Sequence, residues 1–169
     1  MTSGATLSFH ACPEAYALRH FYWQLFATLT FVEPPTTRAA SLPLVFAWLR
    51  DVARAGRIHF KRLMWVLRFE IGTKGDRGHY HLCLAGVPRA LLSQHLCRSL
   101  ESAWRARGGG LSEVTLYDQA RDGLSYVLKL RLMVEGVKVT RTGSFRISND
   151  DCEPMLSVSL IEAVRRGRM

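Results

Sequence analysis

The middle of the chain reads Arg77-Gly78-His79-Tyr80-His81-Leu82-Cys83-Leu84-Ala85-Gly86. Apolar and aromatic residues between two glycines predict a short strand over residues 79–85. Successive side chains of a strand lie on opposite faces, so His79 and His81 share one face and Tyr80 lies on the other. Two imidazoles on one face make half of a metal site. An isolated His-x-His pattern more often belongs to an ordinary half-buried sheet, so its meaning depends on the rest of the chain.

The preceding segment predicts the partner of this strand. Residues 63–72 are mostly apolar and predict a second strand, and residues 73–78, rich in Gly, Lys and Asp, predict the turn that joins the two. Directly opposed residues of an antiparallel pair share a face. Glu70 therefore joins the histidine face in either of two registers, opposite His79 or opposite His81, whereas a one-residue slip would remove it. The hairpin predicts a divalent metal site, suited to Mn²⁺ or Mg²⁺ and also to Zn²⁺, formed by Glu70, His79 and His81.

Hydrophobic periodicity and helix-start signals extend this order in both directions. The expected elements are a strand over residues 23–32, a helix beginning at Ser41 and stopping at Gly56, strands over 63–72 and 79–85, a helix beginning at Pro88 and ending before Gly108, a strand over 111–117 and a helix over 119–130. Further expected elements are a short helix over residues 13–19, a hairpin over 133–147 and a basic helix over 156–166. This is the split β-α-β order, βαββαβ. It predicts an α+β fold: an antiparallel sheet of four to five strands with helices packed on it, in a single domain over residues 1–169.

The composition restricts the partner and the compartment. The chain has 169 residues, 48% of them hydrophobic, and a net charge of +9 that comes mostly from arginine. Arginine pairs well with phosphate, so the charge indicates a polyanionic partner, most often nucleic acid. The four cysteines include no C-x-x-C pair. Without that pair, a secretion signal or a membrane-spanning stretch, the sequence predicts a cytoplasmic protein with no membrane partner.

One predicted helix carries a second group of reactive side chains. At about 100° per residue, Asp122, Tyr126 and Lys129 fall within roughly 60° of one another on the helix circumference. The apolar residues Leu124 and Val127 fall on the opposite arc, where the core is expected. A tyrosine and a lysine therefore project together from the side of the helix away from the core.

Three motifs in order resemble those of the HUH endonuclease superfamily. Residues 26–31, Phe-Ala-Thr-Leu-Thr-Phe, resemble its apolar Thr-Leu-Thr strand, residues 79–81 its His-hydrophobic-His motif, and residues 126–129 its Tyr-x-x-Lys helix. Glu70 occupies the position of the carboxylate that completes the metal site in many members. The resemblance covers about residues 23–130 and is strongest to single-tyrosine replication initiators of plasmids and single-stranded DNA phages. Residues 131–169 form a C-terminal extension that matches none of the motifs, and no helicase domain is present.

The resemblance implies a nicking and rejoining activity on single-stranded DNA. Tyr126 would attack a phosphate and form a covalent 5′-phosphotyrosine, with Lys129 stabilising the developing charge and a Mn²⁺ or Mg²⁺ ion held at the histidine strand. Asp122 is placed by helix geometry to orient Lys129. The expected DNA contacts are Thr28, Thr30, Arg68, Arg77 and Arg121. The expected partners are an origin or hairpin DNA and the helicase and polymerase of the host.

Three other functions fit parts of the sequence. A single-tyrosine transposase of an insertion sequence would share the same motifs. A non-catalytic nucleic-acid-binding domain would hold structural zinc with the two histidines and Cys83, which lies on the same strand face. A non-haem iron oxygenase would use two histidines and one carboxylate, but it would leave the tyrosine and the basic charge unexplained. Glu70 has its own alternative role, as a surface carboxylate paired with Arg68 or Arg77.

Overall fold

The computed structural model describes residues 18, 21–33, 35, 37–71, 77–121, 123–128 and 155–166, without the side chains of residues 125, 126 and 128. Its strands are β1 (Leu25–Phe31), β2 (Met64–Ile71), β3 (Gly78–Ala85), β4 (Gly109–Leu116) and β5 (Met155–Leu156). Its α-helices are α2 (Arg38–Ala55), α3 (Gln94–Ala106), α4 (Gly123–Leu128) and α5 (Val158–Arg165), with short 3₁₀ turns η3 (Phe60–Arg62), η4 (Arg89–Leu91) and η5 (Gln119–Arg121). None of the helices in these ranges combines the length and the apolar composition needed to cross a bilayer.

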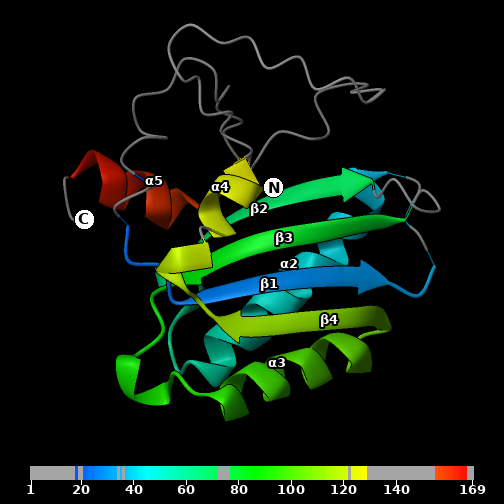
Figure 1. The fold of residues 1–169 in the computed structure, drawn as a ribbon, viewed down its shortest axis with the longest axis horizontal. Coiled ribbons are helices and arrows are strands. Elements are labelled where there is room, and N and C mark those ends of the chain that lie inside the picture. The colour runs from blue at the N-terminus through cyan, green and yellow to red at the C-terminus, as the bar shows by residue number, and fades with distance from the viewer. Residues whose placement is uncertain are drawn as a thin grey trace, which may run out of the picture.

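The fold is α+β, as the sequence predicts. Five antiparallel strands form one sheet in the order β4-β1-β3-β2-β5, with helices packed on it (Figure 1). The first strand, β1, lies between β3 and β4, which is the arrangement that the split β-α-β order produces. The histidine strand β3 is therefore the central strand of the sheet.

The inner face of the sheet packs on α2 and α3 and forms the main core. Alternate residues of β1, including Leu25, Ala27 and Leu29, are fully buried on this face. The rings of Trp48 from α2 and Trp104 from α3 meet edge to face above them, at a centroid distance of 6.4 Å. The β1 residues that face α2 and α3 occupy every second position, as expected for the strand predicted over residues 23–32.

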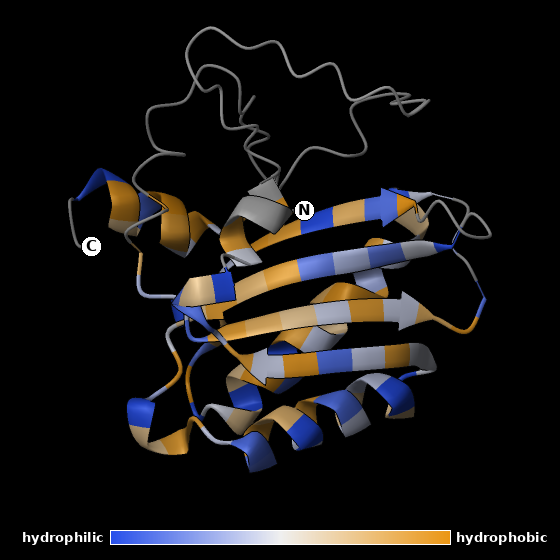
Figure 2. Cartoon of the chain, in the orientation of Figure 1, coloured by the Kyte–Doolittle hydropathy of each residue, from blue (hydrophilic) through white to orange (hydrophobic). Residues whose placement is uncertain are grey.

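The outer face of the sheet is divided along its length. One half is covered by α4 and α5, and a second apolar cluster fills this contact. Its buried members are Leu18, Phe21, Trp23, Val66, Cys83, Ala85, Leu124, Val127, Leu156, Leu160 and Val164. The other half carries the histidines. Figure 2 shows the change along β3, from hydrophilic residues at its start to hydrophobic residues at its end.

The expected N-cap of α2 at Ser41 is wrong, because the N-cap is Thr37, four residues earlier. The helix begins at Arg38, and the Thr37 hydroxyl caps it by accepting a hydrogen bond from the Ala40 amide at 3.2 Å. Ser41 is buried inside the helix, where its hydroxyl is 2.8 Å from the phenol oxygen of Tyr80. Thr and Ser are both favoured at N-cap positions, so Thr37 and Ser41 are equally plausible caps. The contact with Tyr80 places Ser41 inside the helix. The expected stop at Gly56 is confirmed, because Gly56 is the C-cap.

The bounds of other predicted elements also differ from those in the structure. Pro88 precedes the turn η4 and not a helix; α3 begins later, where the Ser93 hydroxyl accepts from the Leu96 amide at 3.2 Å. The predicted helix over 119–130 is divided into η5 and α4 in the described residues, and α5 follows the short strand β5. Strand β4 begins at Gly109, where a Cβ atom would clash with the Trp104 ring. The predicted hairpin over 133–147 lies outside the described residues, as does all of the 13–19 helix except residue 18.

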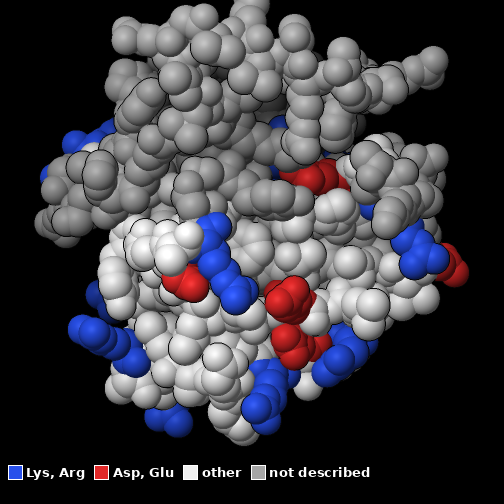
Figure 3. Space-filling view, in the orientation of Figure 1, with Lys and Arg blue, Asp and Glu red and all other residues white. Residues whose placement is uncertain are grey.

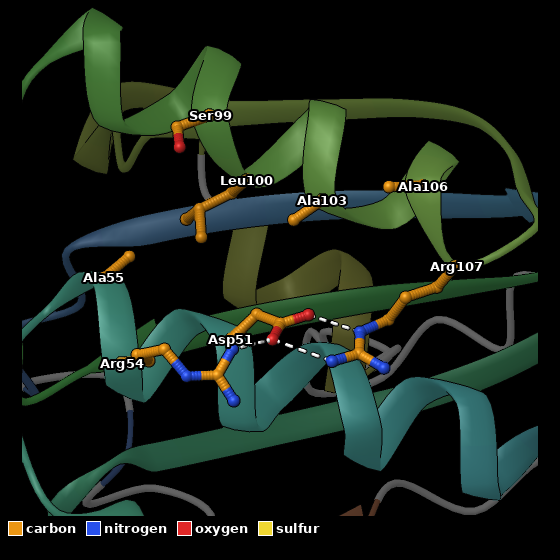
Figure 4. A pocket seen from close by; sticks show the side chains of 8 residues that line it. All are labelled: Asp51, Arg54, Ala55, Ser99, Leu100, Ala103, Ala106 and Arg107. Atoms are coloured by element: carbon orange, nitrogen blue, oxygen red, sulfur yellow. Dashed lines mark hydrogen bonds and ion pairs between the residues drawn. The ribbon is translucent and has the colours of Figure 1, made fainter.

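A charged contact joins α2 to α3 beside a groove of about 520 Å³ (Figure 4). Arg107 donates from Nη2 to Asp51 Oδ1 at 2.8 Å and from Nε to the second carboxylate oxygen. Arg54 donates to the same carboxylate at 2.6 Å. The hydrogen bond from Arg107 is the main cause that holds the pKa of Asp51 below its ordinary value of 3.8, against the raising effect of burial. A carboxylate with a lowered pKa stabilises the fold at neutral pH and ceases to do so as it is protonated.

Replacing this carboxylate should therefore destabilise the protein in a pH-dependent way. We expect Asp51→Asn to lower the free energy of unfolding by about 1 kcal/mol at pH 7, the scale of a partly exposed bidentate pair. Because the pKa is lowered in the folded state, the difference from wild type should shrink as the pH falls below 3.8. Urea unfolding at several pH values measures both effects. Glu162→Gln removes an exposed ion pair with Arg166 and is the matched control, expected to change little; an equal loss in both variants would contradict the assignment.

Candidate metal centre

The pairing of β2 with β3 brings the predicted ligands together. Glu70 lies directly opposite His79, which is one of the two registers that the sequence allows. His81, two residues further along β3, lies opposite Arg68 on one side and Thr28 of β1 on the other. The two histidines and the carboxylate therefore come from two neighbouring strands whose backbone hydrogen bonds fix their spacing.

The side chains converge through specific atoms. Glu70 Oε2 is 3.8 Å from His79 Nε2 and 4.0 Å from His81 Nε2, and the imidazole centroids are 4.7 Å apart. One ligand atom from each of the three residues lies within 4.8 Å of the others. Glu70 and His81 are buried, with 8% and 6% of their surface exposed, while His79 is half-buried. Two imidazole nitrogens and one carboxylate oxygen at this spacing can hold a divalent cation and leave positions open for other ligands.

The carboxylate of Glu70 is shared between two neighbours. Its Oε1 atom is 3.5 Å from Arg68 Nε, while its Oε2 atom faces the imidazoles. The ion pair with Arg68, considered from sequence as an alternative role for Glu70, is thus present beside the metal-ligating arrangement and does not replace it.

Strand β1 supports the His81 ring from two sides. The Thr28 hydroxyl is 3.1 Å from His81 Nδ1, and the Phe26 ring stacks on the imidazole at a centroid distance of 6.0 Å and an angle of 20°. Sequence reasoning assigned Thr28 to DNA and gave Phe26 no role at the site. The signal for both was present: Phe26 and Thr28 share a face of β1, and the split β-α-β order places β1 beside the histidine strand.

The other expected DNA contacts lie in different surroundings. The Thr30 hydroxyl donates to the Leu111 carbonyl of β4 at 2.7 Å. Arg77 is exposed and contributes its backbone carbonyl, 3.3 Å from His79 Nδ1. Arg121 is highly exposed and lies 3.6 Å from Asp118 Oδ2. On the face seen in Figure 3, the described Lys and Arg side chains lie mostly around the rim, so they do not outline a single track for DNA.

Helix α4 places the backbone of Tyr126 on the histidine side of the sheet. Leu124 and Val127 are buried against β2 and β3, as their predicted arc requires. The start of the helix lies very close to β1, because a Cβ atom on Gly123 would come within 2.7 Å of the Phe26 ring. The Tyr126 side chain and the whole of Asp122 and Lys129 lie outside the described residues.

Cys83 lies on the same sheet face as the histidines, but its neighbours are apolar. It is fully buried in the apolar cluster beneath α4, next to Val66 and Val127. The group of potential metal ligands in the described part of the chain consists of Glu70, His79 and His81 without this thiol. The carboxylate, not the cysteine, is therefore the third ligand that this geometry offers.

Comparisons with protein-family models, with curated proteins and with solved structures found no match to this chain.

Removing one ligand should abolish tight metal binding. We expect His79→Ala to weaken Mn²⁺ binding by at least about tenfold, since even residues that only support a ligand are worth that much. Isothermal titration calorimetry on the folded protein measures the change. His95→Ala removes an exposed histidine from α3 and is the matched control. The metal centre would be disproved by unchanged affinity in the His79 variant, or by equal losses in both.

Proposed function

We propose that the protein is a single-tyrosine HUH endonuclease that nicks and rejoins single-stranded DNA to initiate rolling-circle replication of a plasmid or phage. One observation carries the proposal: Glu70, His79 and His81 converge on the same sheet face on which the Tyr126 helix packs. The βαββαβ order and the net charge of +9 agree with it.

The metal centre would prepare the phosphate for attack. Glu70, His79 and His81 would hold a Mn²⁺ or Mg²⁺ ion, which when bound would withdraw charge from the scissile phosphate and fix its orientation. The Arg68 guanidinium, already beside Glu70, would add positive charge near the phosphate.

Tyr126 would be the nucleophile. Its hydroxyl oxygen would form a bond to phosphorus while the bond from phosphorus to the 3′ oxygen breaks, which leaves a 5′-phosphotyrosine and a free 3′-hydroxyl. The phenol proton would pass to the departing oxygen, so no other reactant is consumed. The reverse attack by a 3′-hydroxyl would rejoin a strand without ATP. Lys129 would stabilise the charge on the phosphate, and Asp122 would orient Lys129.

The remaining partners follow from this activity. Arginines and exposed aromatic rings would bind the single strand by phosphate contacts and base stacking at an origin or a hairpin. A nicked origin needs strand separation and synthesis, so a host helicase and polymerase would act with the protein in the cytoplasm. Thr30, Arg77 and Arg121 remain predicted DNA contacts.

A covalent adduct tests the nucleophile directly. We expect wild-type protein to become attached to a labelled single-stranded oligonucleotide in the presence of Mn²⁺, and Tyr126→Phe to form no adduct, because it lacks the attacking oxygen. Denaturing electrophoresis detects the adduct, and a binding assay should show that the variant still binds the oligonucleotide.

The control for this experiment is Tyr22→Phe, which removes the hydroxyl of an exposed tyrosine elsewhere in the chain. It should form as much adduct as wild type. An adduct that persists in Tyr126→Phe would refute the role of this tyrosine. No adduct with wild type on any hairpin or origin oligonucleotide would refute the proposed activity.

A further inference from the structure

We propose that Thr28 is a positioning residue for the metal centre: its hydroxyl accepts the Nδ1 proton of His81 and holds the ring with Nε2 toward the other ligand atoms, whereas the nearby Thr30 has no such role. The inference rests on the proposed function only in taking a metal ion as the occupant of the site. It needs neither DNA nor the nucleophile.

The neighbouring histidine shows the arrangement that a ligating imidazole requires. His79 Nδ1 is 3.3 Å from the Arg77 carbonyl oxygen, and its Nε2 faces Glu70 at 3.8 Å. A carbonyl only accepts hydrogen bonds, so His79 Nδ1 must carry the proton. The lone pair is then on Nε2, directed toward the other ligand atoms.

At His81 the same arrangement requires Thr28 to act as the acceptor. His81 Nε2 is 4.0 Å from Glu70 Oε2, and His81 Nδ1 is 3.1 Å from the Thr28 hydroxyl oxygen. A hydroxyl can donate or accept, so this contact allows either tautomer. Ligation through Nε2 selects one: Nδ1 donates its proton to Thr28, as Nδ1 of His79 does to the carbonyl. Histidine ligands of metals are commonly held in this way, through the nitrogen that does not bind the metal.

The hydroxyl is delivered by backbone pairing and not by a mobile loop. Thr28 lies directly opposite His81 in the β1–β3 register. A β-branched side chain in a strand has restricted rotation about χ1, so the oxygen stays where the backbone places it. The Phe26 ring, stacked on the imidazole, limits tilting in the remaining direction. Together, the Thr28 hydroxyl restricts rotation of the His81 ring within its plane, and the Phe26 ring restricts its tilting out of that plane.

Thr30 is the natural contrast. It lies directly opposite His79, in the position on β1 that corresponds to Thr28 opposite His81. Its hydroxyl instead donates to the Leu111 carbonyl at 2.7 Å, where the register of β1 with β4 shifts. The two threonines are thus alike in sequence and in strand face but make different contacts. Losing the Thr30 hydroxyl should leave the imidazoles unaffected.

Three substitutions separate a positioning role from a structural one. Thr28→Val keeps the side-chain shape and removes the hydroxyl, Thr30→Val does the same at the control position, and Thr28→Ser restores the hydroxyl. Thermal unfolding first shows that all three fold. The first readout is the NMR signal of the His81 Nδ1 proton in Mg²⁺-saturated protein, where a hydrogen bond slows the exchange of that proton with water. The second is Mn²⁺ affinity by calorimetry.

Thr28→Val should leave the His81 Nδ1 proton without its acceptor, so that its signal is lost through exchange with water, and should weaken Mn²⁺ binding by about 10- to 100-fold. Thr28→Ser should restore both values, and Thr30→Val should match wild type. An unchanged Nδ1 proton signal in Thr28→Val would overturn the proposal, as would an equal effect in Thr30→Val or the absence of Mn²⁺ binding by wild type. Because neither readout uses DNA, the two decide the role of Thr28 even if the protein forms no covalent adduct.

Discussion

The pairing of Glu70 with His79 across β2 and β3 is the constraint on which both the core and the candidate metal centre depend. The same register that aligns these ligands places Phe69 opposite Tyr80 on the inner face, with ring centroids 5.1 Å apart. Side chains alternate strictly along both strands, so the ligands cannot be moved without moving the core. The site is therefore maintained by the hydrophobic effect acting on the opposite face of the sheet.

The division of the outer face follows from where its apolar residues stop. Val66 and Cys83 lie under α4 and α5, and further along the same strands the outward positions become Arg68, Glu70 and His81. Burying these charged and polar groups under a helix would be costly without full pairing. The apolar half is covered by α4 and α5, while the polar half carries buried Glu70 and His81 beside half-buried His79, so one sheet face holds both an anchoring region and the candidate metal centre.

The fold class, the inward set of β1 and the ligand trio could be predicted from sequence because each depends on residue alternation alone. The choice between the two registers could not, since it depends on the geometry of the turn between β2 and β3. Thr37 and Ser41 are both good helix caps, and only the contact with Tyr80 decides between them. Thr28 contacts His81 of β3, whereas Thr30 contacts the Leu111 carbonyl of β4. This difference could not be predicted, because it depends on β1 pairing with a strand on each side. The roles of Tyr126, Lys129 and Asp122 stay predictions.

The central position of β3 has a consequence for how the molecule opens. Both of its edges are paired, to β1 and to β2, so exposing its backbone requires two sets of strand hydrogen bonds to break together. Local opening is least favourable in such a segment and easier in short peripheral elements. Helix α4 has only six residues and is held by Leu124 and Val127. The strand that carries His79 and His81 is therefore the part of the sheet in which local opening is least favourable.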